Sequence, residues 1–231
     1  VGGQPRPAVA IEIVDGRISS IDLDCDAGPG DATRLAGFTI PGLANAHSHA
    51  FHRALRSRTQ ADRGTFWTWR EQMYRAAARL DPDSYHRLAR AAFAEMVLAG
   101  ISCVGEFHYL HHQPDGKPYG SPNAMGNALL AAADEAGIRI TLLDTLYLHG
   151  GLDSGGHAEP AGPQRRFSDG TVDAWVDRVG LLQSTDTHRI AAAVHSVRAV
   201  DPTSIARVAE WATGVDAPVH AHVSEQIDEN E

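Results

Sequence analysis

Three histidines stand close together in the segment PGLANAHSHAFHRAL, residues 41–55. They are His47, His49 and His52, and they follow an apolar run that is typical of a β-strand. Successive side chains of a strand point to opposite faces, so His47 and His49 are expected to project from the same face. Two imidazoles on one face can bind a metal ion, but a complete site needs further ligands from elsewhere in the chain.

A second histidine pair lies far along the chain in HAHVSEQ, where His220 and His222 precede Glu225. With thirteen histidines in the chain one such pair could arise by chance, but two pairs at strand ends indicate a metal site. Three nitrogen ligands with an open fourth position suit a hydrolytic zinc ion, and Glu225 could carry the proton. His111 and His112 are adjacent residues that point apart on an extended chain, so we do not expect them to be ligands.

The arrangement of apolar segments changes at Pro41. Before it, two short alternating segments around Asp15-Gly16 predict a β-hairpin in a small N-terminal unit, residues 1–37. After it, from residue 38 to 231, apolar strands without polar alternation are separated by amphipathic helices, which predicts a parallel sheet buried on both faces. The expected helices cover residues 82–99, 122–136 and 202–213, and the expected strands cover residues 37–47, 101–110, 138–148, 189–197 and 217–225.

Parallel α/β folds place their functional residues at the carboxyl ends of the strands, which is where both histidine pairs lie. The glycine- and proline-rich residues 150–170 are too polar for a helix or strand and are expected to form a loop over a strand end.

The composition excludes several classes of partner. A net charge of -9, from twenty basic and twenty-nine acidic residues without a basic cluster, argues against nucleic acid and anionic membranes. No apolar run reaches the roughly 18 residues that a spanning helix needs, and the N-terminal segment lacks the features of a signal peptide. Two cysteines form no disulfide framework, so we expect a cytoplasmic protein that acts on a small molecule.

The motifs PGLANAHSHA and HAHVSE resemble the first and fifth strand motifs of the amidohydrolase superfamily. FWTWREQMYR, GEFHYLHH and AAVHSVRAV resemble those of the formimidoylglutamate deiminases, a family of histidine degradation. This resemblance covers residues 37–225 and implies a (β/α)8 TIM-like barrel of the amidohydrolase type, of which the chain supplies about the first five βα units. It also implies a homodimer.

The resemblance assigns roles to individual residues. It makes His47, His49 and His222 the ligands of one divalent metal ion, for which zinc is expected, and Glu225 the catalytic proton shuttle. A second metal is not expected, because the superfamily's bridging lysine is replaced by a histidine on the fourth strand and the chain's one lysine lies elsewhere. The residues implied to bind substrate are Arg70, Tyr109, His195, Arg198 and His52, the last at a position where the family often has glutamine.

Each of these substrate contacts also has a structural interpretation. By default a helical arginine such as Arg70 is solvated, and Tyr109 could be a core tyrosine with a bonded hydroxyl. His195 and Arg198 follow the fourth strand, where a loop residue would face substrate. Trp67 and Trp69 are expected to serve packing.

The implied reaction is the hydrolysis of N-formimino-L-glutamate, a dicarboxylate, to N-formyl-L-glutamate and ammonia. One alternative is another mononuclear aminohydrolase, acting on a purine or triazine-like ring. The other is a truncated, non-catalytic barrel fragment. Members of the family continue for three more strands that bring a histidine and an aspartate to the site, so we expect this 231-residue segment alone to be incomplete and inactive.

Overall fold

The computed structural model describes residues 4–25, 30–59 and 64–230. Contacts divide the chain into two compact units, Val1–Pro41 and Gly42–Glu231. In the first unit, strand β1 (Ala10–Val14) pairs antiparallel with β2 (Arg17–Asp22). Asp15 and Gly16 connect them with φ values of 51° and 71°, a left-handed pair that suits a tight hairpin turn. The predicted hairpin is confirmed.

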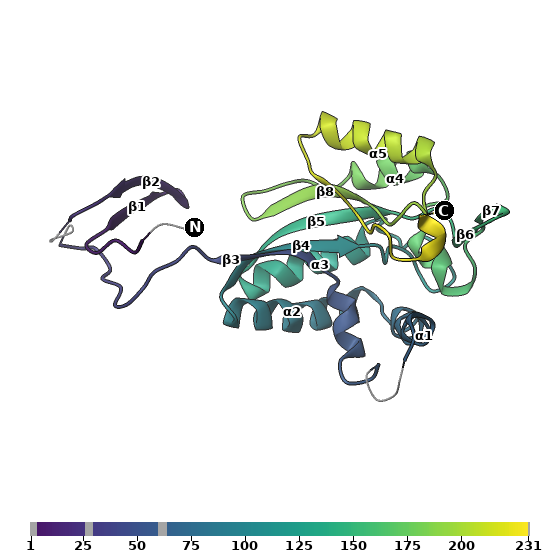
Figure 1. Ribbon diagram of the computed structural model, residues 1–231, viewed down its shortest axis with the longest axis horizontal. Helices are drawn as coiled ribbons and strands as arrows, with labels where there is room; N and C mark the ends of the chain where they lie inside the picture. The colour runs from purple at the N-terminus through teal and green to yellow at the C-terminus, as the bar shows by residue number, and fades with distance from the viewer. Residues whose placement is uncertain (1–3, 26–29, 60–63, 231) are drawn as a thin grey trace. The chain divides into compact units, whose positions relative to one another are not determined.

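The second unit is built on one parallel sheet of five strands in the order β3-β4-β5-β8-β9 (Figure 1). The strands are β3 (Leu43–Ser48), β4 (Ile101–His108), β5 (Arg139–Leu146), β8 (His188–Val194) and β9 (Val219–Ala221). Each strand lies beside the next one along this order, and the sheet curls as the first part of a (β/α)8 barrel does. The predicted fold class is confirmed. Strand β3 starts only at Leu43, because Pro41 has no N–H to donate to a ladder.

Helices follow the strands and pack on the sheet. Figure 1 shows α2 (Pro82–Leu98) and α3 (Ala124–Ala136) against β4 and β5, and α4 (Val172–Val179) beside α5 (Pro202–Gly214) over β8. A further helix, α1 (Phe66–Ala77), and a 3-10 helix, η1 (Ala50–Leu55), lie between β3 and α2. None of the helices in the described ranges is long and apolar enough to span a bilayer.

The N-termini of two helices follow the cap residues from which they were predicted. Asp81 and Asp201 accept hydrogen bonds from the backbone N–H groups of Ser84 and Ser204, and a proline follows each cap as predicted. The predicted start of α3 at residue 122 is wrong by two residues. Asn123 precedes the helix without capping it, since its Oδ1 accepts instead from Nη1 of Arg178 at 3.1 Å and its Nδ2 donates to the carbonyl of Arg178 at 2.7 Å.

The segment 150–170 is more regular than the prediction of a plain loop. It contains a hairpin of β6 (Gly151–Asp153) and β7 (Gly156–Ala158), followed by the 3-10 helix η2 (Gly162–Phe167). Asp153 accepts a hydrogen bond from the N–H of Gly155, and Gly156 has a φ of 99°, so local turn chemistry forms the hairpin without apolar alternation. The expectation of a structureless loop is therefore corrected.

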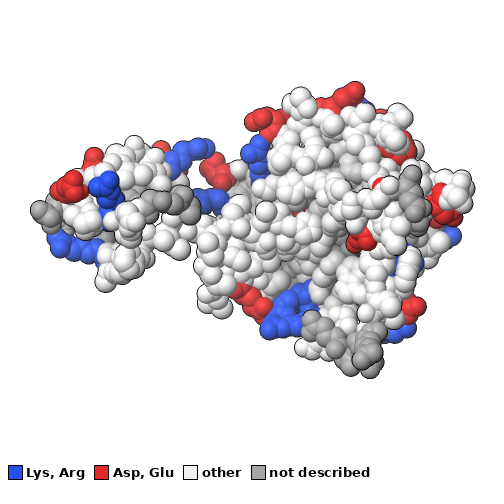
Figure 2. Space-filling view, in the orientation of Figure 1, with Lys and Arg blue, Asp and Glu red and all other residues white. Residues whose placement is uncertain are grey.

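The apolar core lies between the sheet and its helices, with Trp175, Phe93 and Leu142 among its fully buried side chains, while Phe107 is buried on the other face of β4, where its ring stacks on that of His222. On the face shown in Figure 2, basic side chains lie in small separate groups among neutral and acidic residues.

Candidate active site

A pocket of about 230 Å³ opens at the carboxyl ends of the strands in the larger unit. Its wall mixes imidazoles, guanidinium groups and aromatic rings. Eight of the nine residues proposed from the sequence line it; these are His49, His52, Arg70, Tyr109, His195, Arg198, His222 and Glu225. The ninth, His47, belongs to the histidine cluster at its edge. Residues from positions 49 to 225 therefore meet in one pocket.

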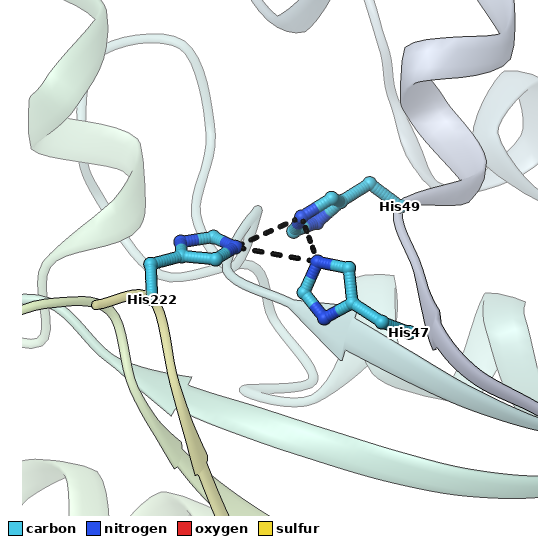
Figure 3. A group of neighbouring side chains, drawn as sticks. All are labelled: His47, His49 and His222. Carbon is cyan, nitrogen blue, oxygen red and sulfur yellow. Dashed lines mark hydrogen bonds between the residues drawn. The ribbon is translucent and has the colours of Figure 1, made fainter. Parts of the chain in front are cut away.

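Three imidazoles converge on a single point (Figure 3). The Nε2 atoms of His47 and His49 lie 3.0 Å apart, those of His49 and His222 3.2 Å, and those of His222 and His47 3.4 Å. His47 and His49 project toward the site, whereas Ser48 between them is buried on the other side, as the alternation of a strand requires. His222 follows β9, and its backbone N–H donates to the carbonyl of His195. The curl of the sheet brings the first and last strands together.

The protonation of these rings suits metal binding. The Nδ1–H of His49 donates to the carbonyl of Phe107 at 3.0 Å, which leaves its Nε2 with a free lone pair toward the other two rings. Burial lowers the pKa values of His49 and His47, and it lowers the pKa of His222 to about 4. Neighbouring imidazoles lower all three further. The three rings are therefore neutral at pH 7, the form that ligates.

The cluster fits a tetrahedral metal ion. With zinc–nitrogen bonds of about 2.0–2.1 Å, tetrahedral geometry places two ligand nitrogens roughly 3.3 Å apart. The observed separations of 3.0–3.4 Å match this value. Three neutral Nε2 lone pairs within such distances would repel one another without a cation between them. The arrangement therefore has the donor set and spacing of a site with three protein ligands and an open fourth position.

Glu225 and Arg198 form an ion pair beside the imidazoles. The Nη2 of Arg198 donates to Oε2 of Glu225 at 2.7 Å, and its Nη1 donates to Oε1 of Glu229. Glu229 is almost fully buried, with 1% of its side chain exposed. The guanidinium of Arg198 is thus engaged by two carboxylates of the chain itself, a pairing that the sequence did not indicate.

Arg70 differs from Arg198. Its guanidinium lies 4.3 Å from the ring centroid of Trp67 and 5.6 Å from that of Tyr74. Within the ranges that the structure describes, it forms no ion pair. Arg70 therefore presents an uncompensated positive charge to the pocket. Trp69 also lines the pocket, where packing alone was expected.

His52, Tyr109 and His195 form the inner wall. The Nε2 of His52 lies 2.9 Å from the hydroxyl of Tyr109, and burial lowers the pKa of His52 to about 3. The ring of His195 lies 5.1 Å from that of His222 and 5.2 Å from that of Tyr109. Burial also holds the pKa of His195 well below its usual range, so both histidines are neutral at pH 7.

Three polar residues of the pocket, Tyr74, Tyr147 and Gln164, were not foreseen. Gln164 donates from Nε2 to the hydroxyl of Tyr147 at 3.0 Å and to the carbonyl of Gly150 at 2.7 Å. Tyr147 directly follows β5, so the strand-end rule that pointed to His195 could have found it. Gln164 lies in η2, and nothing in its local sequence distinguishes it from a surface glutamine.

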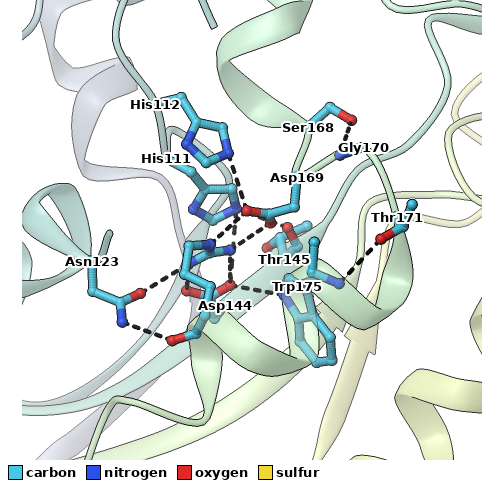
Figure 4. Close-up of polar contacts among 12 residues, drawn as sticks. His111, His112, Asn123, Asp144, Thr145, Ser168, Asp169, Gly170, Thr171 and Trp175 are labelled. Atoms are coloured by element: carbon cyan, nitrogen blue, oxygen red, sulfur yellow. Dashed lines mark hydrogen bonds and ion pairs between the residues drawn. The ribbon is translucent and has the colours of Figure 1, made fainter. Parts of the chain in front are cut away.

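A second group of possible ligands, His108, His111 and Asp144, is fully buried elsewhere in the core. Both carboxylate oxygens of Asp144 accept hydrogen bonds from Arg178, at 2.8 and 2.9 Å, and the indole of Trp175 donates to one of them (Figure 4). The Nε2–H of His111 donates to the carbonyl of Thr145, the residue that follows Asp144 in β5. With both oxygens occupied and a guanidinium alongside, this group does not fit a cation.

Comparisons with known proteins agree with this geometry. The chain is 40% identical over 218 residues to formimidoylglutamate deiminase of Pseudomonas aeruginosa, covering 92% of this chain and 47% of the relative. It is 28% identical to 8-oxoguanine deaminase of the same species, over 87% of this chain and 43% of that protein. The chain thus spans about half the length of the curated relatives it matches.

Solved structures show the same fold. An amidohydrolase from Brucella melitensis superposes with a TM-score of 0.85 at 37% identity, over 96% of this chain and 49% of that one. Atrazine chlorohydrolase from Arthrobacter aurescens, crystallised with zinc, superposes with a TM-score of 0.64 at 24% identity, over 81% and 41% of the two chains. The family model of the amidohydrolases matches residues 38–231. The resemblance expected from the strand motifs is confirmed, and the chain belongs to the amidohydrolase family.

Proposed function

We propose that this chain serves the metal-dependent hydrolysis of N-formimino-L-glutamate to N-formyl-L-glutamate and ammonia, a reaction of histidine degradation in the cytoplasm. The observation that carries the proposal is the triangle of Nε2 atoms opening onto a pocket that also holds Arg70 and Arg198. The similarity to a formimidoylglutamate deiminase supports it. Two free cysteines favour the cytoplasmic location.

In this proposal His47, His49 and His222 hold one divalent metal ion, with zinc as the favoured identity. The bound ion would supply a Lewis acid that makes water nucleophilic near neutral pH. The carbonyl of Phe107 holds the ring of His49, and the carbonyl of His195 accepts from the backbone N–H of His222 and so holds the chain at that residue.

Glu225 is the proposed proton shuttle. Water adds to the amidine carbon, so that a C–O bond forms and the bond to the terminal nitrogen breaks. The carboxylate of Glu225 takes one proton from the water and passes it to the terminal nitrogen. As the carbon–nitrogen bond breaks, the proton of the new hydroxyl follows the same route, so that ammonia leaves and the carbonyl of the formyl group remains. Arg198 holds Oε2 of Glu225 at 2.7 Å and thereby fixes the direction of the carboxylate.

Arg70 is the proposed anchor of a substrate carboxylate. Its planar fork can hold a carboxylate through two hydrogen bonds, and it has no carboxylate partner in the described ranges. Arg198 is already paired with two acidic residues, so it offers less net positive charge. The net charge of -9 opposes the approach of a substrate with two carboxylates, and the positive charge of Arg70 offsets this locally.

A second candidate is deamination of a purine or triazine-like ring. It is favoured by the aromatic residues that also line the pocket, Phe66, Trp69, Tyr74 and Phe167, which could stack on a planar ring. The relative named 8-oxoguanine deaminase points the same way. The unpaired guanidinium of Arg70 favours the dicarboxylate over this alternative.

The two functions are separated by ammonia release from the zinc-loaded full-length protein. The substrates are N-formimino-L-glutamate, N-formiminoglycine with a single carboxylate, and 8-oxoguanine. We expect N-formimino-L-glutamate to be hydrolysed fastest, and Arg70→Met to lower its kcat/KM by about 30- to 1,000-fold while affecting the monocarboxylate less. Arg70→Lys should recover part of the loss.

Arg75→Met is the matched control, because Arg75 lies in the same helix with an exposed side chain paired to Glu71. This variant should hydrolyse all three substrates as the unaltered protein does. Faster turnover of 8-oxoguanine would favour the ring deaminase. An equal loss on both formimino substrates in Arg70→Met would show that Arg70 does not hold the side-chain carboxylate, the one that N-formiminoglycine lacks.

A further inference from the structure

Glu106 is a fully buried acidic residue of β4 that the proposed chemistry does not use. Its Oε1 accepts a hydrogen bond from the backbone N–H of Ala50 at 2.6 Å. Its Oε2 is buried without a hydrogen-bond partner among the residues that the structure describes. Burial raises its pKa to about 7, against the opposing effects of Ala50 and the hydroxyl of Ser48. Burying a carboxyl with so few hydrogen-bond partners costs free energy, so its one hydrogen bond, to Ala50, is of interest.

The side chain of Glu106 contacts the histidine segment from behind. In the register of the sheet, Ser48 of β3 lies opposite Glu106. Ser48 and Ala50 are buried, whereas His47 and His49 alternate with them and project into the site. Glu106 therefore hydrogen-bonds the N–H of Ala50 and lies opposite Ser48, the two residues that alternate with the two histidines, on the face of the strand away from the pocket.

The hydrogen bond to Ala50 also supplies a missing helix cap. Ala50 is the first residue of η1, and its N–H has no partner within the helix. The preceding residue, His49, occupies the cap position but makes no capping hydrogen bond, because its ring is turned toward the other imidazoles. Glu106 takes over this role from the neighbouring strand.

Glu106 and its neighbour Phe107 thus hold the same ligand at two points. The carbonyl of Phe107 accepts from the ring of His49 at 3.0 Å, and the carboxyl of Glu106 accepts from the backbone N–H that follows it. Together they fix the ring direction and the chain direction of His49. Groups that orient metal ligands in this way contribute to metal affinity without touching the metal.

We propose that Glu106 is a positioning residue of the metal site, acting through the backbone of residues 48–50 to keep the imidazoles of His47 and His49 aimed at the third. The inference rests on the proposed role of these histidines as metal ligands. It assigns to Glu106 no contact with metal or substrate. Without Glu106 the N–H of Ala50 is unpaired, and the turn between β3 and η1 loses the bond that fixes it.

The test is zinc affinity of the full chain, measured without substrate by competition with a chromophoric chelator. In Glu106→Leu we expect affinity to fall about 10- to 100-fold, the usual effect of removing a group that orients a ligand. Glu106→Gln keeps an oxygen acceptor for Ala50 and should recover most of the affinity. Glu106→Asp moves the carboxylate oxygen away from Ala50 by the length of one methylene, so its zinc affinity should be intermediate. It replaces the leucine variant in the test if that variant does not fold.

Val104→Ala is the matched control, since Val104 is a fully buried residue of the same strand that lies opposite Asn45 in the sheet register, three residues before Ser48. It should lower the unfolding midpoint but leave zinc affinity unchanged. In the cobalt-substituted protein, Glu106→Leu should also change the visible absorption of the tetrahedral ion, and Val104→Ala should not.

Two results would overturn the proposal. The first is an unaltered zinc affinity in both Glu106→Leu and Glu106→Asp. The second is a Val104→Ala variant that unfolds at the same midpoint as Glu106→Leu and loses as much zinc affinity. Failure of the proposed reaction is a separate outcome. A protein that binds zinc tightly but releases no ammonia from N-formimino-L-glutamate would reject the substrate and leave the role of Glu106 standing.

Discussion

Replacement of Arg178 by methionine should lower the free energy of unfolding more than the replacement of a solvent-exposed arginine does. Arg178 lies in α4 and makes paired hydrogen bonds of 2.8–2.9 Å to Asp144 and to Asp169. Figure 4 shows these groups within one network, in which His112 lies 3.0 Å from Asp169. The side chain of Asp144 is fully buried and that of Asp169 is 4% exposed, so methionine would leave two buried carboxylates without a cation.

The pKa values set the magnitude. Burial alone would raise the pKa of Asp144, but the charge of Arg178 brings it down from 3.8 to about 2. That change corresponds to about 2 kcal/mol of stability at neutral pH. The pKa of Asp169 is lowered as well, by its hydrogen bonds to His112 and Arg178 against the effect of burial. Removing one partner of a buried ion pair costs about 3–5 kcal/mol, so we expect Arg178→Met to lower the free energy of unfolding by about 4 kcal/mol at pH 7.

The loss of unfolding free energy in Arg178→Met should become smaller as the pH falls. A carboxyl group whose folded-state pKa is lowered stabilises the fold above its unfolded pKa, here 3.8, and this contribution disappears as pH falls through the folded value of about 2. In Arg178→Met the unpaired carboxyls should protonate more readily and relieve the penalty in acid. The difference between the two proteins should therefore be largest at pH 7 and shrink toward pH 3.

Urea unfolding at pH 7 and pH 4, followed by circular dichroism and tryptophan fluorescence, measures this difference. Arg207→Met is the control, because its ion pairs with Asp173 and Glu210 are long, at 3.8 and 3.6 Å, and solvent-exposed. It should change stability by less than about 0.5 kcal/mol. A loss below about 1 kcal/mol in Arg178→Met, or one that does not vary with pH, would refute the view of this network as a buried, charge-balanced cluster.

Two further predictions concern the metal site in the full-length protein. The double variant His47→Ala, His222→Ala should lose bound zinc, because one remaining imidazole cannot compete with water and buffer; full metal content by elemental analysis would contradict the assignment. Glu225→Gln should keep the metal while turnover falls by about two to four orders of magnitude, the usual range for an acid–base group. Loss of metal together with activity would instead make Glu225 a ligand.

The sequence predicted most reliably what local patterns determine. Unbroken apolar runs predicted the parallel strands, and cap residues such as Asp81 and Asp201 predicted the helix starts. The alternation of a strand predicted that His47 and His49 share a face, because that geometry involves only neighbouring residues. The strand-end rule then placed His222 at the same side of the sheet.

What escaped prediction depends on contacts between distant segments. The short helix α4 was missed although Thr171 caps it and its apolar residues have helical spacing, but the partner of its Arg178 could not be foreseen, because Asp144 lies 34 residues earlier in the chain. The pairing of Arg198 with Glu229 joins two strand ends that only folding brings together. Ionic partners of this kind have no periodicity in sequence, so a single chain can reveal the presence of charged residues but not which of them meet.

Of the proposed metal ligands, His47 lies on β3, while His49 and His222 directly follow β3 and β9, the first and last strands of this sheet, and are separated by 173 positions along the chain. The strands between them, β4, β5 and β8, supply no ligand of this cluster. An ion shared by the two edge strands would nevertheless be released whenever a middle strand opened, since the edges would then part. At 100 times its dissociation constant such an ion would add about 2.7 kcal/mol to every opening of this kind. Amide hydrogens throughout the middle strands would then exchange about 100-fold more slowly, although none of those strands touches the metal.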